Sequence, residues 1–104
     1  HDALPICCEK FQEERRTFGS ELESISFLRV IPSQANYFLC EVLPPFRSHE
    51  LAVRLLNEQN ILIKDCSSKK AFNGRSYIRL AVRNRADNSR LVSALRQMEA
   101  EAAG

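Results

Sequence analysis

The segment from Asn60 to Val82 constrains the fold of this chain more than any other part of the sequence. It contains two short apolar runs, Ile61–Lys64 and Tyr77–Val82, and a polar stretch that separates them. This pattern predicts two strands joined by a loop. Side chains alternate between the two faces of a strand, so Arg79 is expected on the face opposite to the aliphatic residues of its strand.

Arg79 is the residue in this segment that most needs an explanation. A guanidinium in the middle of an apolar strand loses hydration unless an anion or another acceptor meets it. A structural ion pair with Asp65 or Glu41 across the sheet would satisfy Arg79, and so would an anionic ligand. Lys64 ends the preceding strand, where its ammonium is either a solvated charge or a second contact for the same ligand.

The rest of the chain predicts three helices and one further pair of strands, from apolar periodicity and from turn residues. The helices are expected at about Pro5–Ser24, Ser48–Glu58 and Arg85–Ala102, and the strands at about Phe27–Ile31 and Asn36–Val42. These two strands are close enough along the chain to form an antiparallel, hairpin-like pair. Ser48 and Asn84 are the expected N-caps, and Asn60 is expected to close the second helix in the left-handed conformation.

The resulting order of elements is α-β-β-α-β-β-α, with no internal repeat and no low-complexity linker. One mainly antiparallel sheet covered by helices is the economical packing for this order, which makes the expected fold class α+β. A chain of 104 residues is long enough for one small domain, or for one part of a larger enzyme.

The composition argues against several classes of protein. A net charge of +2 gives no support for bulk nucleic-acid binding, and RNA binding through Lys69–Arg75 is a weak alternative because aromatics do not interleave with its basic residues. No apolar run approaches the roughly 20 residues of a membrane span. The 4 cysteines form no Cys-x-x-Cys pair, so we expect reduced thiols, no metal site and a cytoplasmic protein.

Three blocks of the sequence carry a resemblance to a known family. Val30–Leu39 contains a proline-serine-x-alanine-asparagine-aromatic turn, Ile61–Ser67 is a strand ending in a basic residue and an aspartate, and Tyr77–Asn88 joins an arginine-bearing strand to a helix. In this order they resemble the C-terminal small domain of fold-type I pyridoxal-phosphate enzymes. The most similar branch is that of histidinol-phosphate aminotransferase and threonine-phosphate decarboxylase.

The resemblance implies that residues 1–104 form one domain, the C-terminal small domain of a larger enzyme whose cofactor-binding large domain is absent here. The abrupt start at His1 agrees with such a fragment. In the family, the arginine that matches Arg79 binds the carboxylate or phosphate of the substrate. The basic residue that matches Lys64 assists in the phosphate-using members, where it is usually arginine.

The resemblance also implies pyridoxal phosphate as the cofactor of the full-length protein, an amino acid as its substrate, the protein's own large domain as a partner, and a homodimer. In the family, the lysine and the aspartate that hold the cofactor belong to the large domain, so we expect this chain alone to bind no cofactor and to be inactive. The expected substrate-binding residues are Arg79 and Lys64. The alternative is a stand-alone, ferredoxin-like regulatory module that binds a small anionic ligand through the same two cations.

Overall fold

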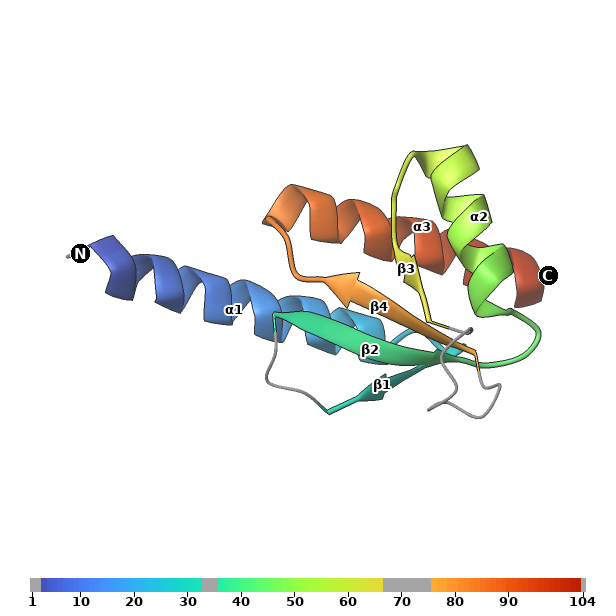
Figure 1. The fold of residues 1–104 in the computed structure, drawn as a ribbon, viewed down its shortest axis with the longest axis horizontal. Helices are drawn as coiled ribbons and strands as arrows, with labels where there is room; N and C mark the ends of the chain where they lie inside the picture. The colour runs from blue at the N-terminus through green and yellow to red at the C-terminus, as the bar shows by residue number, and fades with distance from the viewer. Residues whose placement is uncertain (1–2, 33–35, 67–75, 104) are drawn as a thin grey trace.

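The computed structural model describes residues 3–32, 36–66 and 76–103 of the chain (Figure 1). The described residues form helices and strands in the order predicted from the sequence. The helices are α1 (Ala3–Glu23), α2 (Ser48–Gln59) and α3 (Arg85–Ala103), and the strands are β1 (Leu28–Ile31), β2 (Tyr37–Val42), β3 (Lys64–Asp65) and β4 (Tyr77–Ala81). The α+β fold class is therefore confirmed.

The strands form one antiparallel sheet in the order β1-β2-β4-β3. β1 and β2 are the expected hairpin-like pair, with Ile31 opposite Leu39. β4 lies between β2 and β3, so Arg79 has Leu39 as its partner on one side and Lys64 on the other. This strand order places Arg79 in an inner strand and Lys64 in an edge strand of the sheet.

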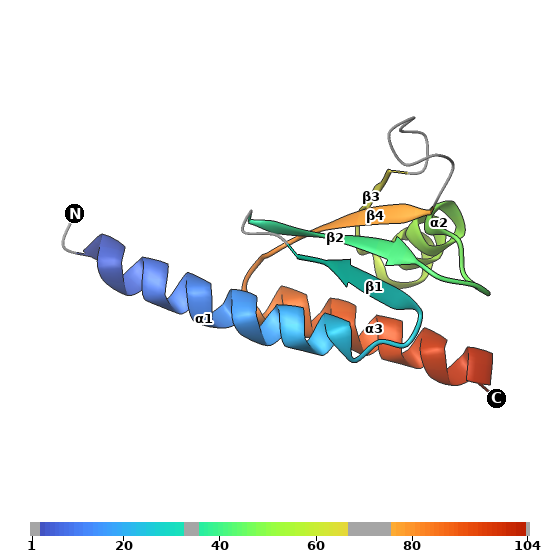
Figure 2. The same ribbon diagram turned by 90° about the horizontal axis from the view of Figure 1, so that it is seen from below.

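The helices and the sheet share one core, and α1 and α3 lie side by side along one face of the sheet (Figure 2). α2 adds Leu51 and Leu55 to the same core. The first turns of α1 extend beyond the sheet (Figure 1), and Phe11 is 37% exposed there. None of the described helices covers the opposite face, which we call the helix-free face; Arg79, Lys64, Tyr37 and Leu39 lie on it.

The alternation predicted for β4 is confirmed. Ile78 and Leu80 are buried in the core, whereas Arg79 and Ala81 are exposed. Tyr77 belongs to the same face as Arg79 but is buried at its end of the strand, where its hydroxyl lies 3.4 Å from a side-chain nitrogen of Arg29.

The strand predicted for Ile61–Lys64 is wrong for its first three residues. β3 consists of Lys64 and Asp65 alone, and Leu62, in the connection before it, is 82% exposed. The backbone N–H of Ile61 donates to the carbonyl of Leu55 in α2. The start of the apolar run is therefore hydrogen-bonded to the end of α2 and is not part of the sheet. The strand was predicted there only because the run is rich in aliphatic residues.

The predicted helix caps are confirmed at two of three positions. Asn60 has φ 56° and ψ 37°, the left-handed conformation expected at the end of α2, and the side-chain oxygen of Asn84 accepts the N–H of Asp87 at 2.8 Å. Ser48 is not a cap: it is the first residue of α2, after Arg47 in an extended conformation. Its side chain is buried, and its backbone N–H donates to the hydroxyl of Ser76, a partner distant in sequence.

Gly19 lies at the close approach of α1 to β2, and we predict that alanine destabilises the fold there. A Cβ on Gly19 would lie 2.8 Å from Cζ of Phe38, whose ring is also in edge contact with Phe18, at a centroid distance of 5.9 Å. Overpacking should outweigh the gain in helix propensity, so we expect Gly19→Ala to lower the free energy of unfolding by about 1–2 kcal/mol. Urea unfolding measures this change.

The matched control for Gly19→Ala is Ser20→Ala, at the next position of α1, where the side chain is exposed. It should leave stability unchanged or raise it slightly, because alanine favours the helix. Equal midpoints for the two variants would contradict the close-approach explanation.

Cys40 gives the stability of the fold a predictable dependence on pH. Its thiol is buried in β2, and burial raises its pKa from 9.0 to about 12. The folded chain keeps this proton while the unfolded chain releases it, so the contribution of Cys40 is complete below pH 9 and is lost as pH rises from 9 towards 12. We expect a loss of about 1.4 kcal/mol per pH unit in that window.

Urea unfolding at a series of pH values from 7 to about 10.5 would measure the effect. Cys40→Ala should be less stable throughout, because it leaves a small cavity, but it should lose less stability than the wild type as pH rises. Parallel curves for the two proteins would contradict the prediction.

Candidate functional site

The structure brings together the two residues that the sequence singled out as a binding pair. Arg79 in β4 and Lys64 in β3 are direct partners across the sheet, and both side chains are exposed on the helix-free face. Two like charges directly opposite each other in a sheet repel one another. An anion bound between the two side chains would relieve this repulsion.

The ion pair that the sequence offered as another explanation of Arg79 is not formed among the described residues. Glu41 instead accepts a hydrogen bond from Nε of Arg29 at 2.7 Å. Asp65 is the register partner of the inward-facing Ile78, and its carboxylate lies 3.4 Å from the ring of a histidine in α2. Neither carboxylate is paired with Arg79.

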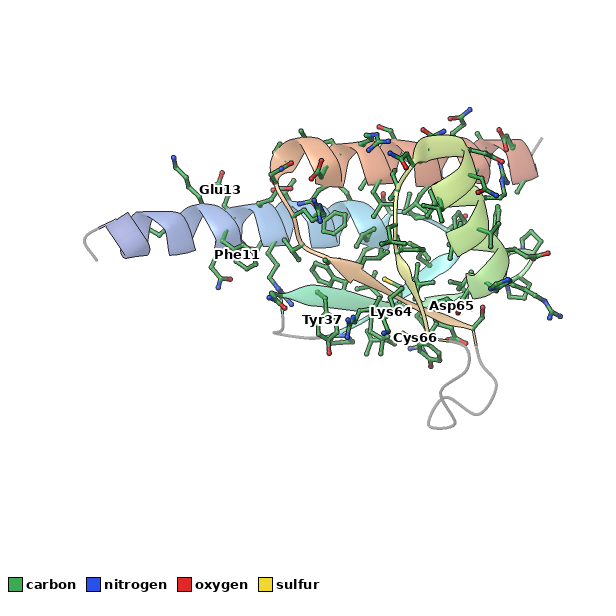
Figure 3. All side chains as sticks on the ribbon, turned by 45° about the horizontal axis from the view of Figure 1, so that its top comes forward. Phe11, Glu13, Tyr37, Lys64, Asp65 and Cys66 are labelled. Carbon is green, nitrogen blue, oxygen red and sulfur yellow. The ribbon has the colours of Figure 1, made fainter. Side chains whose placement is uncertain are left out.

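Among the described residues, Arg79 lies next to an aromatic ring. Cζ of Arg79 lies 5.0 Å from the centroid of the Tyr37 ring, within the distance at which a cation is attracted to an aromatic face. Tyr37 in β2 and Lys64 in β3 flank β4 on its two sides (Figure 3). The candidate site thus consists of the guanidinium of Arg79, with the ring of Tyr37 on one side and the ammonium of Lys64 on the other. The sequence did not predict the role of the ring, because Tyr37 and Arg79 become neighbours only through the register of β2 and β4.

The guanidinium can bind a carboxylate or a phosphate with two parallel hydrogen bonds, since its N–H donors form a rigid fork. The ammonium of Lys64 would add a point charge without that geometry. Half-buried Leu39, opposite Arg79, gives the site an apolar side. The arrangement therefore suits a small molecule that carries an acid group.

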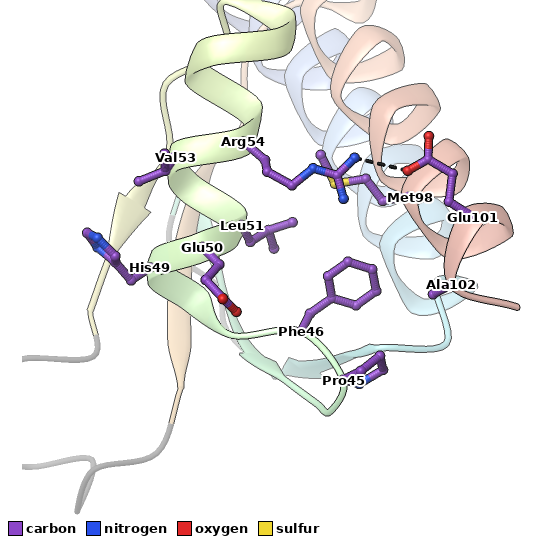
Figure 4. Close-up of a pocket in the computed structure, with 10 residues that line it drawn as sticks. All are labelled: Pro45, Phe46, His49, Glu50, Leu51, Val53, Arg54, Met98, Glu101 and Ala102. Atoms are coloured by element: carbon purple, nitrogen blue, oxygen red, sulfur yellow. Dashed lines mark hydrogen bonds and ion pairs between the residues drawn. The ribbon is translucent and has the colours of Figure 1, made fainter.

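A hollow that is separate from these residues lies between α2 and α3 (Figure 4). It has a volume of about 680 Å³, and Phe46, Leu51 and Met98 are among its apolar lining residues. Arg54 reaches across it to Glu101 at 3.0 Å. Neither Arg79 nor Lys64 lines this hollow. A local sequence pattern does not predict it, because its walls come from segments that are separate along the chain.

The described residues do not by themselves fit pyridoxal phosphate. The cofactor is held by an enclosed lysine and an acidic partner for its ring nitrogen, whereas the described lysines, Lys10 and Lys64, are both exposed. These residues also contain no cluster of three or more histidine, cysteine or acidic side chains that could hold a metal.

No helix in the described ranges combines the length and the hydropathy of a membrane span. Two parts of the sequence analysis, the segment Lys69–Arg75 and the turn at residues 33–35, lie outside the described residues.

Comparison with known proteins gives consistent matches. Residues 7–95 match the family described as aminotransferase class I and II. Threonine-phosphate decarboxylase of Salmonella typhimurium is 38% identical over 89 residues, which cover 84% of this chain and 23% of that protein. CMP-5'-(3-aminopropyl)phosphonate synthase of Streptomyces rubellomurinus is 31% identical over 96 residues, covering 92% of this chain and 15% of that protein.

Comparison of the fold with solved structures also finds proteins of the aminotransferase type. The crystal structure of histidinol-phosphate aminotransferase from Clostridium acetobutylicum aligns with a TM-score of 0.76 and 31% identity, over 88% of this chain and 27% of that one. The chain therefore spans less than a third of the length of these three proteins.

Proposed function

Because this chain belongs to the class I and II aminotransferase family, we propose that it is the small domain of a pyridoxal-phosphate-dependent aminotransferase or of a related decarboxylase. Its similarity to the histidinol-phosphate aminotransferase and threonine-phosphate decarboxylase branch, expected from the sequence, is confirmed. Its proposed task is to bind the acid group of an amino-acid substrate through Arg79, with Lys64 as the second cation. A large domain that holds the cofactor, elsewhere in the same protein, is part of this proposal.

The observation that carries the proposal is the cross-strand pair of Arg79 and Lys64. Both cations are exposed on one face, and neither has a carboxylate partner among the residues that the structure describes. Adjacent unneutralised cations are unfavourable in a sheet without a ligand. An anionic group bound between the two side chains would neutralise both charges, and this supports the proposal.

The contribution of this chain to the reaction would be positioning. The fork of Arg79 fixes the acid group of the substrate in place and direction, and Lys64 offsets further negative charge. A substrate held at one end presents its remaining bonds in a defined orientation. Such orientation can lower the activation free energy of a reaction by several kcal/mol. Pyridoxal phosphate, bound in the rest of the protein, supplies the electron sink for bond breaking.

We further propose that the full-length enzyme is a cytoplasmic homodimer. The two cysteines whose side chains are described, Cys40 and Cys66, are both free thiols, which agrees with a reducing compartment. The dimer follows from the family resemblance alone.

The experiment that tests the proposed function is purification of the whole protein encoded by the gene in the presence of pyridoxal phosphate. We expect a bound cofactor that absorbs visible light, and a change in that absorption when amino acids are added. A protein that binds inorganic phosphate but no pyridoxal phosphate would favour the regulatory module instead. A protein that binds neither would overturn both functions.

A further inference from the structure

Tyr37 contacts the guanidinium of Arg79 on the helix-free face of the sheet. The distance from Cζ of Arg79 to the ring centroid is 5.0 Å, and a cation within about 6 Å of an aromatic face is attracted to it. The ring is half-buried while Arg79 is exposed, so the ring is the better fixed of the two. We infer that Tyr37 is a positioning residue, which holds Arg79 ready to receive an acid group.

The register of the sheet explains why the contact forms. Tyr37 is paired with Ala81, and Arg79 is paired with Leu39, so Tyr37 and Arg79 are diagonal neighbours on one face. Diagonal positions are about 7–8 Å apart, a gap that aromatic and long side chains bridge. Ala81, beside Arg79 in the same strand, has only a methyl group, which leaves space for the guanidinium to lean towards the ring.

A ring leaves the guanidinium more available than a carboxylate would. A carboxylate takes up N–H donors, and a ligand has to displace it before binding. An aromatic face attracts the charge and leaves the donors at the guanidinium edge for the ligand. Because the side chain is already held, less rotamer freedom is lost when the ligand binds. The inference rests on the proposed function of Arg79 and deepens it.

A second arginine on the same face shows the contrasting arrangement. Arg29 donates from Nε to Glu41 at 2.7 Å and approaches the hydroxyl of Tyr77 at 3.4 Å. Its charge is neutralised by a neighbour within the sheet. The face therefore carries one arginine held by a carboxylate and one held by a ring, and Arg79 is the one left with charge for a ligand.

The first test needs no ligand and uses nuclear magnetic resonance of the 104-residue chain. Protons above an aromatic ring are shifted upfield by the ring current. We expect such a shift for the side-chain protons of Arg79 in the wild type and in Tyr37→Phe, which keeps the ring. The shift should disappear in Tyr37→Leu. An unchanged Arg79 signal in folded Tyr37→Leu would overturn the inference.

The second test is titration of the same proteins with inorganic phosphate. Tyr37→Leu should bind phosphate about two- to fivefold more weakly than the wild type, as expected for loss of an exposed cation–ring contact. Tyr37→Phe should restore the affinity, and Ile31→Ala, which trims a half-buried residue of the same face, should leave it unchanged. Equal losses in the leucine and phenylalanine variants would assign the effect to the hydroxyl and overturn the role of the ring.

Two further outcomes are informative. If Tyr37→Leu does not fold, Ala81→Val tests the same contact, because added volume at an exposed strand position should move the guanidinium off the ring and remove the shift; a retained shift would count against the inference. If the wild type binds no phosphate or carboxylate, the proposed function of Arg79 fails, while the ligand-free comparison still decides whether Tyr37 positions Arg79.

Discussion

Replacing Arg79 with glutamine is expected to weaken binding of an acid group by about ten- to a hundredfold, since a hydrogen bond to a charged partner contributes about 1.5–3 kcal/mol. Glutamine keeps a polar side chain on the exposed face but loses both the charge and the fork. Arg79→Lys should recover only part of the affinity, because an ammonium cannot form two parallel hydrogen bonds. Titration of the chain with phosphate or acetate measures the change, and if the proposed function holds, the full-length protein should show a corresponding rise in KM.

The matched control for this prediction is Arg29→Gln. Arg29 lies on the same face, but it is paired with Glu41. Its loss should therefore have little effect on ligand binding, apart from a small long-range charge effect that salt screens. Similar losses of affinity in the two variants would indicate a diffuse positive surface and would contradict a site built on Arg79.

The sequence predicts those parts of the fold that depend on local pattern. The alternation in β4 predicted that Arg79 and Ile78 lie on opposite faces of the strand, and this is confirmed; that Arg79 is exposed to solvent was not predicted. Asn60 and Asn84 were identified as helix-terminal residues because their short side chains suit those positions, and both are found there. Each prediction needed only neighbours within a few residues along the chain.

The remaining features depend on contacts between distant segments. The pairing of Arg79 with Lys64, and its contact with Tyr37, follow from the strand order and register, which a local pattern does not contain. The strand predicted at Ile61–Ile63 was wrong because composition does not show that the N–H of Ile61 is hydrogen-bonded to the end of α2. For Ser48, the deciding partner is the hydroxyl of Ser76, from a segment far along the chain.

Replacing Leu95 with alanine should cause the largest loss of stability that we predict. Leu95 in α3 is completely buried in the core shared by the helices and the sheet. Removing its branched end leaves a cavity that the packed neighbours cannot fill, so we expect the free energy of unfolding to fall by about 2–5 kcal/mol. Domains of this size have a total stability of only about 5–15 kcal/mol, so the variant should be marginally stable at 25 °C, as urea unfolding would show.

The control for Leu95→Ala is the same chemical change at Leu62, which is 82% exposed. Little apolar surface is lost to the core at Leu62, so Leu62→Ala should change the free energy of unfolding by less than about 0.5 kcal/mol. A large loss at Leu62 would mean that this leucine is covered in solution by a contact that the single chain does not show. A small loss at Leu95 would contradict the single core, and with it the rigid sheet on which the placement of Arg79 and Lys64 depends.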